Sequence, residues 1–437
     1  MLFVPSPWHL ANLVRYVPPC HRQSFQQLFF ALPNELQVHI LKILSLHDLL
    51  DLRTVSRSWH TLVTLHEAPV VRYHLAHHIP IYALRLYPSR DATSATLHHL
   101  CGLWHRLHVA AKLSRLICEW ATKEIFLRTT EARRLEFAPQ SERMYRRLVP
   151  LVFTIFHFFE HYRQLHIKYI NDHDGHGLLH TPYTLNPIET RVMSMYDDAT
   201  LLRVHEVFPL VIASFCRRLR PPTYIGRVER SLRGYLRDKP ADEVHSAILC
   251  IGGLRQVEKL WEVKGYGARR TAVDVWYNSI VRPPPDTTKR PAAASKSDRS
   301  FMSIKRKKAN AIEDDDADKP AAEARPSLSD RASVGSSSLV FNTSLASGMP
   351  MGPLNATSLA LLLADMPVLQ QIWSPTAEAL ILERKVVERP QDINRNTQVL
   401  LELIREDGFE MGDDWSYGTA GHDSVMPPSG STEDDAL

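Results

Sequence analysis

The sequence has 437 residues, 44% of them hydrophobic, and a formal net charge of only +4. That length allows two or three domains, and so small a charge gives no general affinity for nucleic acid. The five cysteines are spaced singly, as in reduced intracellular proteins, which argues against a disulfide framework. The N-terminus lacks the basic start and apolar core of a secretory signal. We therefore expect an intracellular protein of the nucleus or cytoplasm.

Residues 1–30 contain several prolines and no sustained period, so they form a lead-in that could pack back on the rest of the chain. The stretch 31–68 predicts three short helices. The first begins at Pro33, because the fixed φ of proline suits the first helical turn. Four apolar residues then recur at helical spacing and form the predicted core face of this helix: Leu36, Ile40, Ile43 and Leu44.

Three further apolar residues, Leu32, Val38 and Leu41, lie off that core face. We expect them to be buried by a partner protein, where each would contribute about 1.5–3 kcal/mol. The alternative is that they pack on later helices of this same chain. A domain of this size struggles to bury enough surface alone, so it should lean on something else.

The second helix is predicted to start after Ser45, because Ser45 and Asp48 have the spacing of an N-terminal cap. The third runs from Val55 through Trp59 to Val63. Together the three helices read Leu-Pro-x-Glu-Leu, an aliphatic helix, Ser-Leu-x-Asp-Leu and Val-Ser-Arg-x-Trp. This order resembles the F-box. The matching residues are Leu32, Pro33, Glu35, Leu36, Ile40, Leu41, Leu44, Leu46, Asp48, Leu49, Leu52, Val55, Ser56, Arg57 and Trp59.

F-box proteins bind the Skp-type adaptor of a cullin-RING ubiquitin ligase and carry a separate region that selects the substrate. The resemblance covers about a tenth of the chain and implies that the Skp adaptor is the first partner and a cullin the second. The residues predicted to bind the adaptor are Leu32, Pro33, Glu35, Leu36, Val38, Ile40, Leu41, Leu44, Leu49 and Trp59.

Residues 69–281 predict an irregular helical domain that would hold the protein substrate. A strong helical stretch from 144 to 170 is interrupted or kinked near Pro150. Within it, 148–159 is too short and too interrupted for a membrane span and predicts a buried helix. Leucine-rich and propeller repeats, which read substrates in many F-box proteins, are absent from the sequence.

The composition changes sharply at 282. Residues 282–352 are rich in Pro, Ala, Ser, Lys and Asp and almost without aromatics, so they predict a disordered linker. Short apolar stretches in 353–410 predict helices that dock on the helical domain. The acidic tail, 411–437, is again predicted to be disordered.

Two basic clusters in the linker are typical of a bipartite nuclear localisation signal read by an import receptor. The alternatives are a solvated charge run that balances the acidic block 313–316, or a nonspecific polyanion patch. The predicted signal residues are Lys289, Arg290, Lys305, Arg306, Lys307 and Lys308.

Candidate catalytic and metal sites are weak. The loop with His173 and His176 has metal-ligand types but no second cluster, so we interpret it as a polar loop. Cys118 and Cys216 lack a visible base, and no glycine pair has the lysine of a nucleotide loop. The arginines at 217–220 fit the end of a helix better than a pocket that reads a phosphorylated substrate. We expect no catalytic residue, cofactor or metal.

The sequence thus predicts an all-α protein: a three-helix F-box, an irregular multi-helix domain, a long disordered insert and a disordered tail. The predicted function is a non-catalytic substrate adaptor of an SCF-type ubiquitin ligase. The alternative is a nuclear scaffold that uses the F-box as a hook without ubiquitination. A hydrolase or metalloenzyme would rest on the histidine loop alone.

Overall fold

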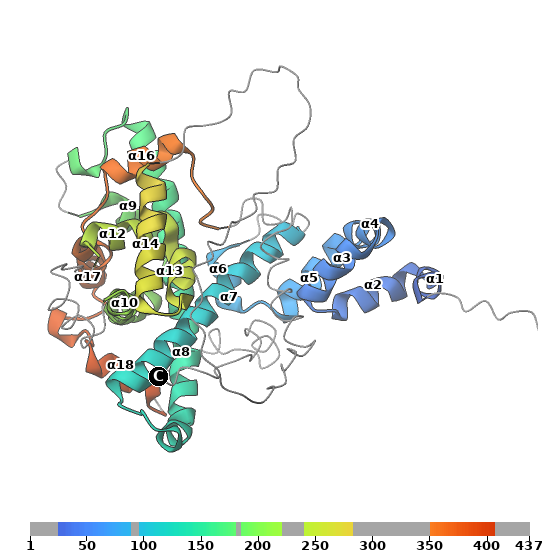
Figure 1. Cartoon of the computed structure of the whole chain (residues 1–437), viewed down its shortest axis with the longest axis horizontal. Coiled ribbons are helices and arrows are strands. Elements are labelled where there is room, and N and C mark those ends of the chain that lie inside the picture. The colour runs from blue at the N-terminus through green and yellow to red at the C-terminus, as the bar shows by residue number, and fades with distance from the viewer. Residues whose placement is uncertain (1–24, 89–95, 181–184, 221–239, 283–349, 407–437) are drawn as a thin grey trace, which may run out of the picture.

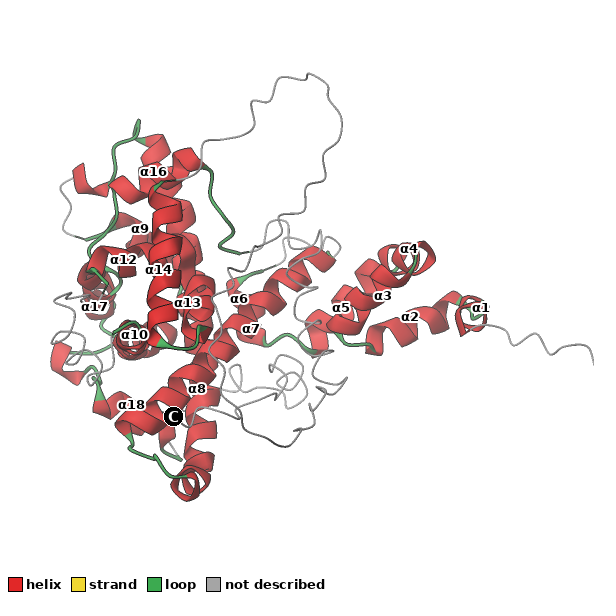
Figure 2. Cartoon of the chain, viewed as in Figure 1, coloured by secondary structure: helices red, strands yellow, loops and turns green. Residues whose placement is uncertain are grey.

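The computed structural model describes residues 25–88, 96–180, 185–220, 240–282 and 350–406. These residues form helices and contain no strand, which confirms the all-α prediction (Figure 2). An arm of five helices projects from a larger helical body (Figure 1). The helices of the arm are α1 (Phe25–Phe30), α2 (Asn34–Ile43), α3 (Leu46–Val55), α4 (Arg57–Leu65) and α5 (Glu67–His77).

The body is built on two long helices that lie against each other, α7 (Leu97–Trp120) and α8 (Glu131–Asp172). The shorter body helices are α6 (Ile81–Leu86), α9 (Pro187–Met193), α10 (Asp198–Arg218), α12 (Asp242–Ala247), α13 (Gly253–Glu262) and α14 (Tyr266–Val281). Two π-helical turns, Ala121–Ile125 and Ile248–Gly252, extend α7 and precede α13. A 3-10 turn, Leu178–His180, follows α8.

Helix α8 forms the centre of the hydrophobic core. Every residue from Leu148 to Glu160 is buried, which agrees with the predicted buried helix. The predicted interruption near Pro150 is wrong, because α8 continues through both Pro139 and Pro150 for 42 residues. Helix α10 is long and apolar enough to cross a membrane by length and composition, yet its apolar residues pack into this same core.

The C-terminal helices α16 (Ala356–Ala364), α17 (Ser374–Glu383) and α18 (Thr397–Ile404) pack on the body. The 3-10 turns Leu369–Gln371 and Pro390–Asp392 connect them. Buried polar contacts hold this segment in place. His166 of α8 contacts the Asp365 carboxylate at 2.7 Å, and Glu189 of α9 accepts a hydrogen bond from the backbone N–H of Trp373 at 3.0 Å. The C-terminal segment is therefore an integral part of the body.

The structure changes one boundary of the predicted linker. Met351 is only 7% exposed and packs in the main core, and the Gly352 carbonyl accepts a hydrogen bond from Arg163 at 3.0 Å. The described C-terminal segment begins at Pro350. The rest of the linker, 283–349, and the tail from 407 onward lie outside the described residues, together with residues 1–24.

Candidate functional site: the N-terminal helical arm

The arm has a hydrophobic core of its own. Its centre is Trp59, whose ring lies 4.7 Å from the ring of Phe29 on α1. The buried residues of this core come from all five helices: Phe29, Leu41, Leu49, Trp59, Leu62, Val63 and Val70. Helix α1 therefore belongs to the arm, although the sequence analysis placed it in the lead-in. The spacing of Phe25 and Phe29, one helical turn apart, was a signal for α1.

The turns between the arm helices are set by side chains that accept backbone hydrogen bonds. The Ser45 hydroxyl accepts from the N–H of Asp48 at 3.1 Å, as the capping pattern predicted. Ser56 accepts from the N–H of Trp59 and starts α4 in the same way. Gln37 is buried and donates its amide to the carbonyl of Leu32 at 2.8 Å. This bond satisfies the side-chain amide of Gln37 inside an apolar core. The burial of Gln37 was not predicted, because glutamine is usually an exposed residue.

The inward face of α2 is not the predicted one. Leu36, Ile40 and Ile43 were predicted to form the core face, but they are 50%, 40% and 63% exposed. The buried face is instead Gln37 and Leu41, with Leu44 half-buried. Both sets have helical spacing and differ by one residue, so spacing alone could not decide which set faces inward. The arm consequently presents an aliphatic stripe of Leu36, Ile40 and Ile43 to solvent.

The ten predicted adaptor contacts are therefore divided between surface and interior. Pro33, Glu35, Leu36 and Ile40 are exposed, and Leu32, Val38 and Leu44 are half-buried. Leu41, Leu49 and Trp59 are 0%, 0% and 4% exposed. The side chains of these last three fill the core of the arm and offer almost no surface to a partner in this structure. For Leu41, packing on this chain's own helices was the correct alternative.

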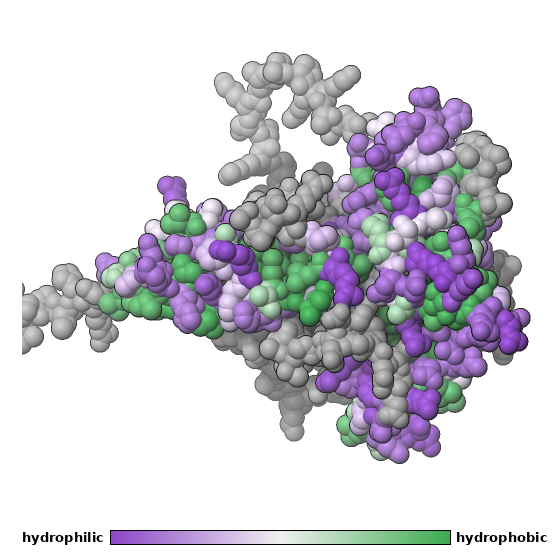
Figure 3. Space-filling view, turned by 180° about the vertical axis from the view of Figure 1, so that it is seen from behind, coloured by the Kyte–Doolittle hydropathy of each residue, from purple (hydrophilic) through white to green (hydrophobic). Residues whose placement is uncertain are grey.

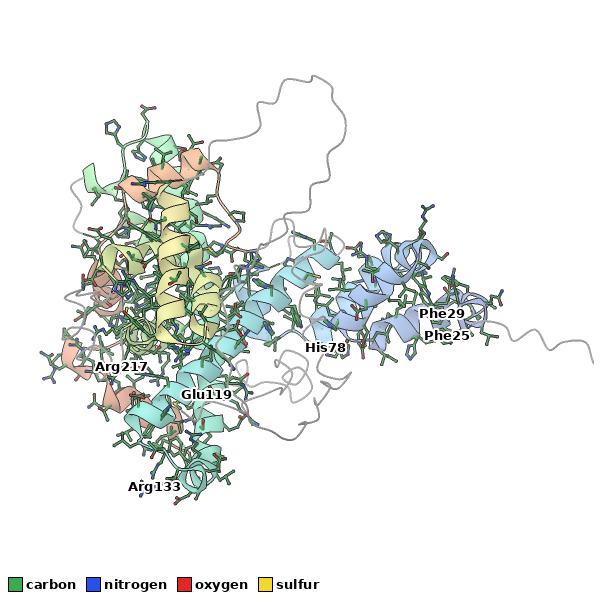
Figure 4. The ribbon with its side chains drawn as sticks, in the orientation of Figure 1. Phe25, Phe29, His78, Glu119, Arg133 and Arg217 are labelled. Atoms are coloured by element: carbon green, nitrogen blue, oxygen red, sulfur yellow. The ribbon has the colours of Figure 1, made fainter. Side chains whose placement is uncertain are left out.

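Other hydrophobic side chains are exposed along the arm, as Figure 3 shows from behind. Phe25 and Leu28 on α1 are 73% and 52% exposed. Figure 4 shows Phe25 and Phe29 at the outer end of the arm, at the greatest distance from the body. Val55 and Leu65, at the ends of α3 and α4, are 67% and 72% exposed. Several isolated exposed side chains are normal on a protein surface, but a stripe on one helix together with an exposed Phe25 is typical of an interaction surface.

Two helices of the arm also pack on the body. Leu50 on α3 and Val71 on α5 lie in the main core, whereas their neighbours Leu49 and Val70 lie in the core of the arm. The Glu67 carboxylate of α5 accepts a hydrogen bond from the backbone N–H of Leu97, at the start of α7. The arm is thus attached to the body by shared packing rather than by a linker.

Histidines line this attachment, where Figure 4 shows His78 between the arm and the body. Burial and the neighbouring His78 lower the pKa of His74 to about 4. Burial and His77 also lower the pKa of His78. The rings of His74 and His78 lie 5.0 Å apart. These side chains are therefore predominantly neutral at pH 7 and act as packing residues.

The remaining candidate sites do not form a catalytic or metal centre among the described residues. His173 and His176 are exposed and their ring nitrogens contact backbone carbonyls, and no group of three metal-ligand side chains is found there. Burial raises the pKa of the Cys118 thiol, so its reactive thiolate form is disfavoured. Arg217 lies 3.6 Å from Glu124 at the end of α10. The basic clusters at 289–290 and 305–308 lie outside the described residues.

Comparison with known proteins agrees with the geometry of the arm. A compact set of short helices with its own core, at the N-terminal end of a helical body, defines an interaction module. Residues 29–67 match the family model described as F-box-like. The chain is therefore an F-box domain-containing protein. Neither the curated proteins nor the solved structures gave a match.

The matched range begins at Phe29, which agrees with the packing of Phe29 on Trp59. It ends at Glu67, the first residue of α5. The match covers α2, α3 and α4 with the end of α1, and it includes no residue of the body. What the body binds must therefore be inferred from its own residues.

Proposed function

We propose that this protein is a non-catalytic substrate adaptor of an SCF-type ubiquitin ligase. The F-box-like arm binds a Skp-type adaptor, which brings a cullin, and the helical body holds the target protein. Catalysis then comes from the proximity of target and ubiquitin-transfer machinery, without an acid, base or nucleophile from this chain. The observation that carries the proposal is the exposed aliphatic stripe on α2, within the segment that matches the F-box-like family.

The stripe suits this role for two physical reasons. Leu36, Ile40 and Ile43 lie on one face of α2, so a partner helix or groove can cover all three together. The arm places this face on a projection from the body (Figure 1), so a bound adaptor need not displace the body helices. Burial of each aliphatic side chain contributes about 1.5–3 kcal/mol, so two of them account for a large share of a stable interface.

The test is capture of partners by the full-length protein and a variant that carries Leu36→Glu and Ile40→Glu. Because both side chains are already exposed, the variant should fold and melt like the wild type. We expect its affinity for the purified Skp adaptor to fall at least about a hundredfold, since two buried aliphatic contacts are lost. The matched control is Val275→Glu with Leu401→Glu, which changes two exposed aliphatic residues of the body, 63% and 53% exposed.

Mass spectrometry of the captured proteins extends the test to the complex. Loss of adaptor and cullin from the arm variant, but not from the control, supports the ligase role. Equal capture of the adaptor by the wild type and the arm variant contradicts the assigned surface. Capture of the adaptor without any cullin favours a scaffold that uses the F-box as a hook. The basic clusters would direct such a scaffold, or the ligase, to the nucleus.

A further inference from the structure

The body contains a pocket of about 420 Å³, away from the arm. Four segments form it. Helices α13 and α14 lie side by side (Figure 1), α8 contributes Arg163, and the start of the C-terminal segment closes one wall with Met351 and Leu354. The pocket therefore exists only in the assembled body.

Gly252 lines the pocket, and the neighbouring Gly253 leaves room for Met351, which also lines it. Gly253 has φ +64°, and a Cβ at this position would lie 2.4 Å from the Met351 Cε. A Cβ on Gly252 would lie 3.1 Å from the ring of Trp276 on α14, and closer still to Gln256. The absence of side chains at both positions lets Met351 and Trp276 approach the start of α13. The glycine pair thus allows an aromatic and aliphatic wall to form.

The polar side of the pocket carries three positive charges. Arg255 and Lys259 are one turn apart on α13, and Arg163 spans the base of the pocket by donating to the carbonyls of Ile251 and Gly352 at 2.8 and 3.0 Å. These carbonyls are neutral, and the carboxylate that acts on the Arg163 guanidinium, Glu160, is itself paired with Arg106 at 2.8 Å. Among the described residues, no ion pair involves any of the three cations, and no acidic residue lines the pocket.

The nearest acids are held elsewhere. Glu258 and Glu262, each three residues after one of these cations on α13, both pair with Lys112 of α7, at 2.7 Å for Glu258. Burial lowers the pKa of Arg255, and burial together with Arg255 lowers the pKa of Lys259, while Glu258 offsets both shifts only in part. Grouping like charges beside apolar walls costs free energy in the empty pocket. A ligand with negative charge relieves that cost.

We propose that this pocket binds a peptide segment of a partner protein in which an anionic side chain, carboxylate or phosphoryl, stands next to a large apolar residue. Arg255 and Lys259 hold the anionic group through charge-assisted hydrogen bonds. The apolar residue packs against Trp276, Ile280 and Leu354. The inference rests on the proposed function, because it names the class of target that the body would present to the ligase.

The experiment measures binding of the full-length protein to immobilised 12-residue peptides. One set has Asp and Glu beside Leu, a second has phosphoserine in place of the acids, and a third has Asn and Gln. The variant is Arg255→Glu with Lys259→Glu. The matched control is Lys123→Glu with Lys264→Glu, which makes the same change in net charge at two exposed positions outside the pocket.

We expect the wild type and the control to bind the acidic or phosphoserine peptides, more weakly as salt rises, and the pocket variant to bind at least tenfold more weakly. A milder variant, Arg255→Gln with Lys259→Gln, serves if charge reversal prevents folding, and should lose the same binding. Equal binding of the amide peptides, or unchanged binding by the pocket variants, overturns the proposal.

The undescribed segment 283–349 leaves and re-enters the described structure beside this pocket, and it contains the acidic block Glu313–Asp316. Peptide binding is therefore also measured for a variant of the full-length protein in which these four acids are changed to amides. Binding that appears only in that variant means that the chain itself fills the pocket, and this overturns a partner as occupant. Capture of the Skp adaptor is measured on the same proteins. Because the pocket is remote from α2, its variants should retain the adaptor, so the two proposals fail separately.

Discussion

At the scale of single residues, buried and half-buried charged groups that join distant segments distinguish this body from a simple helical core. Glu189 is 0% exposed on α9 and accepts a hydrogen bond from the Trp373 N–H. Arg147 donates to the carbonyls of Glu402 and Leu403 at 2.9 and 3.1 Å. These groups satisfy backbone atoms of the C-terminal segment that would otherwise be buried without partners. They fix which backbone atoms of the segment lie against the body, and they also hold the segment there.

Glu189 should make the stability of the protein depend on pH. Burial raises its pKa from 4.5 to about 7, against the opposing hydrogen bonds of Thr376 and Trp373. Between these values the unfolded chain ionises first, so the free energy of unfolding falls as pH rises. Above pH 7 the folded state carries a buried charge.

Replacement of Glu189 with Gln removes this charge and keeps an oxygen that can accept from Trp373. We expect the variant to match the wild type near pH 4.5 and to become more stable as pH rises to about 7, by on the order of 2–3 kcal/mol. Urea unfolding followed by circular dichroism at several pH values measures the difference. A difference that does not change with pH would contradict the raised pKa.

At the scale of elements, α1 is the feature that completes the arm. Its Phe29 is 5% exposed and covers Trp59, whereas Phe25, one turn earlier, is 73% exposed. The same residue type therefore occupies an inner and an outer position on a helix of six residues. A helix so short is stable only through its packing, so removal of the inner contact should release it.

We expect Phe29→Ala to destabilise the arm by about 3–5 kcal/mol, because it leaves a cavity against Trp59. Phe25→Ala is the control and should cost far less. Hydrogen exchange at the amides of α1, α2 and α4 reports the result. If both variants exchange at the same rate, α1 does not contribute to the core of the arm.

At the scale of the whole molecule, the arm and the body share a boundary on which adjacent residues face opposite cores. Leu49 packs in the arm and Leu50 in the main core. Val70 and Val71 divide in the same way on α5. This arrangement predicts that the orientation of the arm is held by the body. A rigid arm would present a bound target to the ligase at a constant position.

Leu50→Ala should therefore affect both parts of the protein, at a cost of about 2–5 kcal/mol. We expect faster hydrogen exchange in α3 and also in α7, which contacts the arm through α5. Leu49→Ala, at 0% exposure in the core of the arm, is the matched control and should raise exchange in the arm alone. Identical exchange patterns for the two variants would show that packing at this boundary does not couple the stability of the arm to that of the body.

The features that depend on interactions between residues close in the chain could be predicted from the sequence. The cap at Ser45, the helix start at Pro33 and the helical composition follow from interactions within a few residues, and the structure agrees with each. The F-box motif was likewise visible from its order of residues, and the family match confirms it. The length of α8 was underestimated, because surrounding helices stabilise it across two prolines that would break an isolated helix.

Tertiary structure alone decided which side chains are available to partners. The spacing of α2 allowed two inward faces. In the structure Leu41 packs in the core of the arm and Gln37 bonds to the carbonyls of Phe30 and Leu32, so Leu36 and Ile40 are exposed. The cationic pocket could not be predicted either, because Arg163, Arg255 and Met351 come from segments up to 188 residues apart in the sequence. Periodicity along a chain reports which residues share a face. Which face is buried depends on packing between elements.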